Sequence, residues 1–141
     1  MDIRKLSAEE TAFIHIRDAD DSLLYETNAD GAPNENNAVG ITVHGPGTQT
    51  YARAKADQNK RLVALMRKKG RSNLSAEETA EESARFLADC TKSFHHIEHG
   101  EKQGYDLYLA VYSDKTIGFI GDQVSTFLGN WGNFTKGSTK T

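Results

Sequence analysis

The stretch LSAEETAEESARFLADCTKSF, residues 74–94, contains the clearest helix signal in the chain. Ser75 precedes Glu78 by three positions, which is the spacing of a capping box. In this motif the hydroxyl accepts from the amide of the third helical residue and the carboxylate reaches back to the cap. Small and apolar side chains then recur at steps of three and four, at Ala80, Ala84, Leu87, Thr91 and Phe94. This periodicity predicts an amphipathic helix that continues to about Phe94.

A second helical pattern ends shortly before this stretch. Thr48 or Thr50 can cap a helix that runs to about Lys69, and Gly70 can end it with a positive φ angle. The basic cluster at its end complements the helix dipole, although an anionic partner would also explain the cluster, formed by Arg67, Lys68, Lys69 and Arg71. Because few residues separate the two helices, we expect an antiparallel helical hairpin.

The seven residues LSAEETA occur twice, at 6–12 and at 74–80, with flanks that do not match. Both copies have the chemistry of a helix start. The first copy is followed at once by the β-rich run Phe13–Ile16, so we expect it to form no more than a turn.

The first third of the chain has the pattern of β-structure. In Phe13–Ile16, Ile14 and Ile16 share one face, and the acidic turn that follows leads to Leu23–Glu26. We predict that these two runs form a hairpin. The Asn-rich residues 27–38 are expected to be a flexible loop. A third strand is predicted over Val39–Val43.

The last third is harder to assign. His95–His99 is interpreted as a helix C-terminus, and Tyr105–Tyr112 as a strand or an extended loop. A final helix is predicted from a cap at Ser113, with a break near Gly121 because glycine weakens helices. Residues 135–141 are expected to be a disordered tail. Together these patterns predict an α+β fold: a small N-terminal antiparallel sheet, a helical hairpin and a C-terminal aromatic-rich helix.

Composition limits the classes of function. The chain has 141 residues, of which 37% are hydrophobic and 26% are charged, which is typical of a single globular domain over residues 1–141. The net charge is −3 with mixed signs, which argues against a nucleic-acid or membrane surface. The chain has one cysteine and shows neither a signal-peptide pattern nor a run long enough to span a bilayer. We expect a cytoplasmic protein.

No residue pattern supports catalysis or a cofactor. His95, His96 and His99 lack the ligands and the base of known zinc motifs. The paired glutamates lie in polar helix starts, and the turn at residues 45–47 lacks the lysine of a phosphate-binding loop. Cys90 is expected to be a buried structural thiol. The sequence therefore predicts no enzyme, no metal and no cofactor, and an enzyme that uses the three histidines is the less favoured alternative.

The remaining candidate is an apolar stripe near the C-terminus. Its aromatic members could pack in the core, or they could anchor a partner protein or a second copy of the chain. The candidate contact residues are Ile117, Ile120, Val124, Phe127, Trp131 and Phe134.

The order of these patterns resembles the tail assembly chaperones of long-tailed bacteriophages and prophages. The resemblance begins with a β-rich hairpin from Phe13 to Glu26. It continues through ITVHGPGTQTYARA (residues 41–54), KADQNKRLVALMRKKG (55–70), SAEETAEESARFLADCT (75–91) and YSDKTIGFIGDQVSTFLGNWGNF (112–134). In the last stretch the matching positions are Ile120, Gln123, Val124, Phe127, Gly129, Asn133 and Phe134.

This resemblance implies a function. Such chaperones bind the long, helical tape measure protein in the bacterial host cytoplasm before the tail tube forms, and they are absent from the mature virion. The major tail protein is a further implied partner. The alternative is a structural tail or tail-completion subunit that is retained in the virion.

Overall fold

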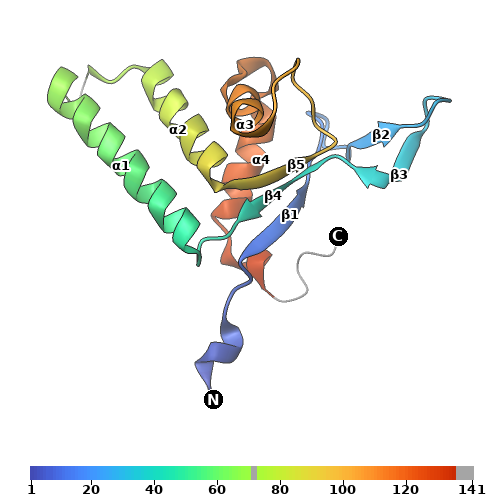
Figure 1. Cartoon of the computed structure of the whole chain (residues 1–141), viewed down its shortest axis with the longest axis horizontal. Coiled ribbons are helices and arrows are strands. Elements are labelled where there is room, and N and C mark those ends of the chain that lie inside the picture. Colours follow the sequence, from blue (N-terminus) through green and yellow to red (C-terminus); the bar gives the residue numbers. More distant parts are fainter. Residues whose placement is uncertain (71–72, 136–141) are drawn as a thin grey trace.

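In the computed structural model, which describes residues 1–70 and 73–135, helices cover one side of a small antiparallel sheet (Figure 1). The predicted α+β fold is confirmed. The elements, with 3₁₀ helices marked η, are η1 (Ile3–Leu6), β1 (Thr11–His15), β2 (Tyr25–Thr27), β3 (Pro33–Ala38), β4 (Gly40–His44), α1 (Gln49–Lys69), α2 (Ala76–Cys90), β5 (Thr91–His95), α3 (Gly104–Ser113), η3 (Lys115–Ile117), α4 (Gly118–Leu128) and η4 (Trp131–Phe134).

The main sheet has the strand order β1-β4-β5, and both pairs are antiparallel. Alternation along each strand turns every second side chain toward the helices. As predicted, Ile14 and Ile16 share a buried face, where they meet Ile41 and Val43 of β4. The core then extends to Leu87, Val124 and other apolar residues from the helices.

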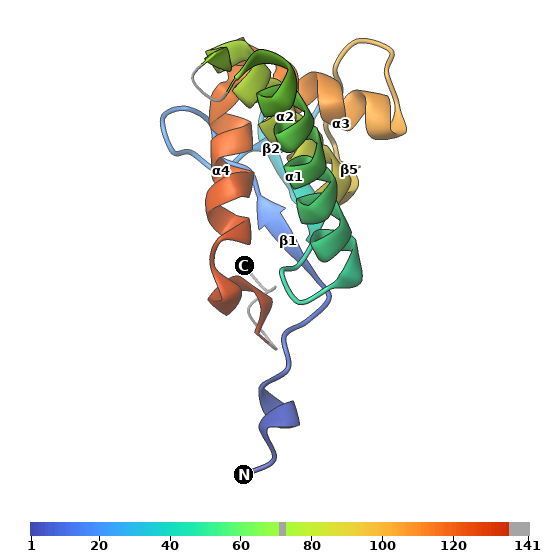
Figure 2. The same cartoon turned by 90° about the vertical axis from the view of Figure 1, so that its left-hand side faces the viewer.

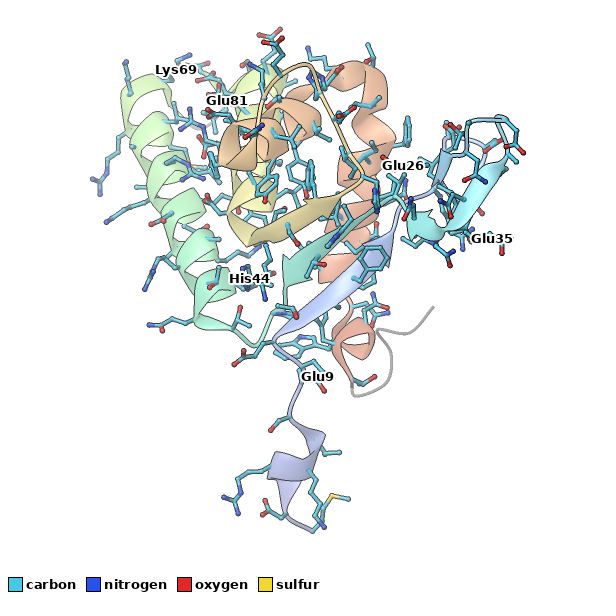
Figure 3. The ribbon with its side chains drawn as sticks, turned by 45° about the vertical axis from the view of Figure 1, so that its right-hand side comes forward. Glu9, Glu26, Glu35, His44, Lys69 and Glu81 are labelled. Atoms are coloured by element: carbon cyan, nitrogen blue, oxygen red, sulfur yellow. The ribbon has the colours of Figure 1, made fainter. Side chains whose placement is uncertain are left out.

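The predicted N-terminal hairpin forms only next to its turn. Arg17 and Leu23 form an antiparallel bridge, and the amides of Asp18 and Leu24 donate to the carbonyls of Ser22 and Ile16. The strand β1 itself pairs with β4, so Tyr25 and Glu26 do not continue along it. Instead, β2 pairs with β3, which forms where we expected only a loop. Gly31 has a φ angle of 85° at the turn, and this β2–β3 hairpin projects from the body (Figure 3). A hairpin that projects into solvent needs no apolar face. The Asn-rich sequence therefore lacked the alternating apolar residues by which a strand is usually predicted.

The helical hairpin is confirmed. Thr48 caps α1, and Gly70 ends it with a φ angle of 84°. Ser75 and Glu78 form the predicted capping box at the start of α2. Ion pairs join the two helices: Lys69 lies 3.0 Å from Glu78, and Arg61 contacts the buried carboxylate of Glu82.

The end of α2 differs from the prediction. The helix stops at Cys90, and Thr91–His95 forms β5 instead of a further helical turn. The partner strand explains the change, because Phe94 pairs with Ile41 of β4, which is remote in sequence. The periodic positions Thr91 and Phe94 therefore fit either structure, and the tertiary pairing decides between them.

Residues 105–112 form a helix, α3, and not a strand or an extended loop. Leu107 and Val111, four positions apart, are its buried residues. Tyr108 and Tyr112 stack on the ring of Phe94, with centroid distances of 4.5 and 5.8 Å. The sequence of residues 105–112 therefore fits a strand or a helix, and packing against Phe94 of β5 favours the helix.

The C-terminal helix is shorter than predicted and is not broken where we expected. Asp114, not Ser113, supplies the cap, and it caps η3. α4 then continues through Gly121. The chain leaves α4 after Leu128, so Trp131 and Phe134 lie on η4. Of the expected tail, Thr135 is exposed, and residues 136–141 lie outside the described residues.

Among the helices of the described residues, none is long and apolar enough to cross a membrane.

Candidate partner-binding surface

The six predicted contact residues do not form one surface. Val124 and Phe134 are completely buried, so a partner cannot reach them in this conformation. Ile117, Ile120 and Phe127 are partly buried. Only Trp131 is largely exposed, with 58% of its surface accessible. Val124 and Phe134 therefore belong to the core, as one of the two sequence interpretations allowed, and a partner contact at the other four residues stays a prediction.

The turn after α4 explains the burial of Phe134. Asn130 caps η4 by accepting from the amide of Gly132, which directs the chain back toward the sheet. The ring of Phe134 then packs on Phe127, at a centroid distance of 5.5 Å, and against Gly45. A Cβ atom at Gly45 would lie 2.6 Å from this ring, so the glycine makes room for it. The helical spacing could not reveal this reversal.

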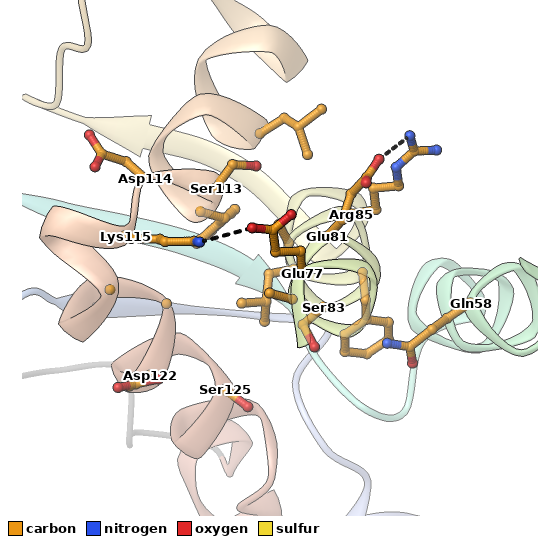
Figure 4. A pocket seen from close by; sticks show the side chains of 18 of the residues that line it. Gln58, Glu77, Glu81, Ser83, Arg85, Ser113, Asp114, Lys115, Asp122 and Ser125 are labelled. Carbon is orange, nitrogen blue, oxygen red and sulfur yellow. Dashed lines mark hydrogen bonds and ion pairs between the residues drawn. The ribbon is translucent and has the colours of Figure 1, made fainter. Parts of the chain in front are cut away.

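A groove of about 1010 Å³ lies among α1, α2 and α4, with the end of α3 and η3 at one side (Figure 4). Figure 1 shows α2 between α1 and α4, and Figure 2 shows α1 in front of α2, with α4 on one side and α3 on the other. The floor of the groove consists of small or apolar residues, which are Ala80, Ala84 and Leu87 on α2 and Gly118 and Gly121 on α4. We call this surface the α2 groove.

Small residues keep the α2 groove wide. A Cβ atom at Gly118 would have nothing within 4 Å, and one at Gly121 would only touch Leu87 and Tyr112. Ala84 is 2% exposed and Leu87 is 7% exposed, so the accessible part of the floor comes mainly from Ala80, Gly118 and Gly121. Close approach of a helix backbone needs such small residues at the contact, because side chains set the distance between helix axes.

The rim of the α2 groove is charged with both signs. Glu77 lies 3.9 Å from Lys115 across the mouth, and the two side chains are 83% and 80% exposed. Such a pair contributes little to stability and can open without a large cost. The ammonium group of Lys55 lies over the ring of Phe86, 4.8 Å from its centroid. Asp122 on α4 completes a rim that can meet a partner of mixed charge.

The histidines do not converge, and the predicted placement of His95–His99 at a helix C-terminus is wrong, because His95 lies in β5. Its Nε2 atom lies 2.8 Å from the hydroxyl of Thr42, whereas His96 faces Glu26 at 3.2 Å and His99 contacts Asp114 at 2.9 Å. In residues 1–70 and 73–135, no group of three His, Cys, Asp or Glu side chains could hold a metal ion.

The pKa values of Cys90 and Asp114 are shifted in opposite directions. Burial raises the pKa of Cys90 to about 12, so the thiol stays protonated at neutral pH. Hydrogen bonds from Thr116 and then from His99 lower the pKa of Asp114 to about 2. Asp114 therefore serves as a permanently charged cap at the edge of the α2 groove.

Comparisons of this chain with protein-family models, with curated proteins and with solved structures found no match.

The sequence did signal part of the α2 groove, because Ala80, Ala84 and Leu87 belong to the predicted apolar face of α2. It did not signal that this face stays partly open. Gly118 and Gly121 were interpreted as weak points of a helix, and their spacing of three was the available clue that they share a surface.

Proposed function

We propose that this protein is a phage tail assembly chaperone that binds a helical segment of the tape measure protein in the α2 groove. One observation carries the proposal: an open groove of about 1010 Å³ with a floor of alanine, glycine and leucine between helices. An amphipathic helix can lay its apolar face into such a groove. The family resemblance of residues 41–70, 75–91 and 112–134 suggests the identity of the partner.

The charged rim supports a carrier role. A long apolar helix tends to aggregate, and a carrier that covers it must itself present mixed charge to water. The side chains around the mouth, among them Lys55, Glu77, Glu81, Arg85 and Asp122, have this character. No covalent step and no cofactor enter this function.

Trp131 is a second candidate contact. Its ring lies beside Gly47, where a Cβ atom would be 3.4 Å from it. Exposed tryptophan is a frequent anchor in protein interfaces. In this proposal Trp131 extends the contact beyond the α2 groove.

Co-expression tests the proposal. If a tape measure protein is encoded by the same phage or prophage, it should be recovered in the supernatant with this chain bound, and it should be largely insoluble alone. Trp131→Ala should lower the recovered fraction. If the tape measure protein is equally insoluble with and without this chain, the proposed function is wrong.

The alternative, a structural tail or tail-completion subunit, predicts a different distribution. A chaperone of the host cytoplasm leaves before the virion matures, so mass spectrometry of purified virions should not detect this chain at stoichiometric levels. Stoichiometric recovery from virions would favour the structural subunit.

A further inference from the structure

The outer edge of β1 is a second surface with its own chemistry. The amide of Ile16 donates to Val39 and the amide of Gly45 donates to Glu10, so the even-numbered backbone groups of β1 face β4. Alternation along a strand then directs the odd-numbered N–H and C=O groups to the opposite edge. These are the groups of Thr11, Phe13 and His15, with Glu9 and Arg17 at the two ends.

Both ends of this edge are already occupied by the chain itself. At one end, the amide of Glu9 donates to the carbonyl of Phe134 at 2.6 Å. At the other end, the amide of Arg17 donates to Oε1 of Gln123, and Nε2 of Gln123 donates to the carbonyl of Arg17, both at 2.8 Å. The carboxamide of Gln123 thus pairs with Arg17 as a neighbouring strand would.

Between these ends the edge is open. Among the described residues, no group pairs with the outward N–H and C=O groups of Thr11, Phe13 and His15. A groove of about 800 Å³ runs beside them, and Phe127 and Asp122 of α4 and Tyr25 of β2 contribute to its walls. We call this surface the β1 edge groove.

We propose that the β1 edge groove binds an extended peptide segment of another protein, about five residues long, which adds a strand to β1 and places a basic side chain near Asp122. Main-chain hydrogen bonds supply the affinity in this mode of recognition, and alternate side chains supply the specificity. The apolar walls at Phe13, Ile14 and Phe127 suit alternate apolar side chains of the peptide.

The charges favour a basic residue in the peptide. Asp122 is exposed, and no ion pair involving it occurs within the described residues. Arg17 also lines this groove, but its guanidinium group is engaged with Asp21. It donates to the backbone carbonyl of Asp21 at 3.0 Å and lies 3.9 Å from the carboxylate of Asp21. The groove therefore carries an uncompensated negative charge on the wall formed by α4.

The blocked ends favour a short peptide over a second copy of β1. In a two-fold pairing centred on Phe13, residue 17 of one copy would lie opposite residue 9 of the other. The carbonyl of Phe134 already occupies that position at Glu9. A free peptide can turn away from β1 at each blocked end. The β1 strand of a second copy cannot turn away, because it is fixed in its own sheet.

Amide hydrogen exchange followed by NMR tests the proposal directly. The probe is a capped hexapeptide, an N-terminal lysine followed by alternating valine and threonine. In the free protein the amides of Thr11, Phe13 and His15 should exchange fast, and those of Ala12 and Ile14 slowly. When the peptide occupies about nine-tenths of the protein, exchange at the three odd-numbered amides should slow about tenfold. The same peptide with N-methylated amides should not bind.

Two variants separate this site from a general effect on folding. Thr11→Pro removes one outward donor without a loss from the β1–β4 ladder, and proline is tolerated at a sheet edge. It should weaken peptide binding about fivefold relative to Thr11→Ala, which keeps the donor. Replacing the peptide lysine by glutamate should weaken binding to the wild type, and Asp122→Asn should remove that preference.

Three results would overturn the proposal. The first is no selective protection of the three amides at about 2 mM peptide, which corresponds to negligible affinity. The second is equal binding by Thr11→Pro and Thr11→Ala with unchanged thermal midpoints. The third is protection that rises with protein concentration in the absence of peptide, which would identify a second copy as the occupant. None of these results depends on the α2 groove.

Discussion

At the scale of single residues, burial decides which aromatic side chains support the fold and which are free to meet a partner. Phe134 and Trp131 are three positions apart on η4, yet Phe134 is completely buried and Trp131 is 58% exposed. Sequence periodicity placed both on one helical stripe. The periodicity could not predict that one ring is buried and the other exposed, because this difference arises from the turn after Leu128.

Substitutions at these two positions should therefore have opposite consequences. Phe134→Ala removes a ring that packs on Phe127 and Gly45 and should lower the free energy of unfolding by about 3–5 kcal/mol. Trp131→Ala should change it by less than about 1 kcal/mol. Urea denaturation followed by circular dichroism measures both. Equal losses in the two variants would show that Trp131 is also part of the core.

The loss of folding stability at acidic pH should depend on Asp114. Its pKa falls from an ordinary value of 3.8 to about 2 on folding, because Thr116 and His99 hydrogen-bond to the ionised carboxylate. A lowered folded-state pKa contributes stability above the unfolded value, and this contribution is lost as the pH falls toward 2. Thermal melts of the wild type between pH 5 and 2 should therefore show a loss that is smaller in Asp114→Ala.

Asp57→Ala, which removes an exposed carboxylate on α1, is the matched control for that experiment. It should retain the acid-dependent loss of the wild type. Parallel pH profiles for the wild type and Asp114→Ala would contradict the assignment.

At the scale of elements, the same local sequence forms different structures in different surroundings. The copy of LSAEETA at residues 74–80 starts α2 with a complete capping box. In the copy at 6–12, η1 already ends at Leu6, and the remaining residues lead into β1. This outcome was predicted, because the residues that follow each copy are visible in the sequence.

The two copies provide a matched pair of substitutions. Ser75→Ala removes the cap of α2 and should cost about 1 kcal/mol of stability. Ser7→Ala removes an exposed hydroxyl that donates to the carbonyl of Arg4 outside the core and should change stability by less than about 0.5 kcal/mol. Chemical denaturation of both variants measures the difference, and equal effects would contradict the role of the capping box.

Elements whose structure depends on distant partners could not be predicted. β5 forms because Phe94 and Ser93 pair with Ile41 and Thr42, about fifty positions earlier. α3 forms where Tyr105–Tyr112 alternates like a strand, because Leu107 and Val111 pack inward together. Local spacing at these positions fits two structures. By contrast, α1, the start of α2 and the buried face of β1 depend on caps and alternation, which the sequence displays.

At the scale of the whole molecule, the part of the chain that the structure describes has two grooves that could each receive a segment of a partner. The α2 groove lies among the helices, and the β1 edge groove lies beside the outermost strand. The first suits a helix and the second suits an extended segment. A chaperone with both grooves could hold two segments of one long partner chain. Because the two segments are linked, binding of the first raises the effective concentration of the second and so the overall affinity.

The central claim is that the α2 groove holds a helix of the tape measure protein, and a groove-filling substitution tests it most directly. Gly118 lies on the groove floor with open space around its Cβ position, so Gly118→Trp should fill the groove without disturbing the core. Ala56→Trp is the control, because Ala56 is exposed on α1 outside the groove lining.

The decisive measurement is the fraction of co-expressed tape measure protein that stays in the supernatant with each variant. We predict that Gly118→Trp lowers this fraction toward the level found without the chain, while Ala56→Trp matches the wild type. Thermal midpoints of both variants should stay close to that of the wild type. If Gly118→Trp, folded and stable, keeps the tape measure protein in solution as well as the wild type does, the α2 groove is not the binding site.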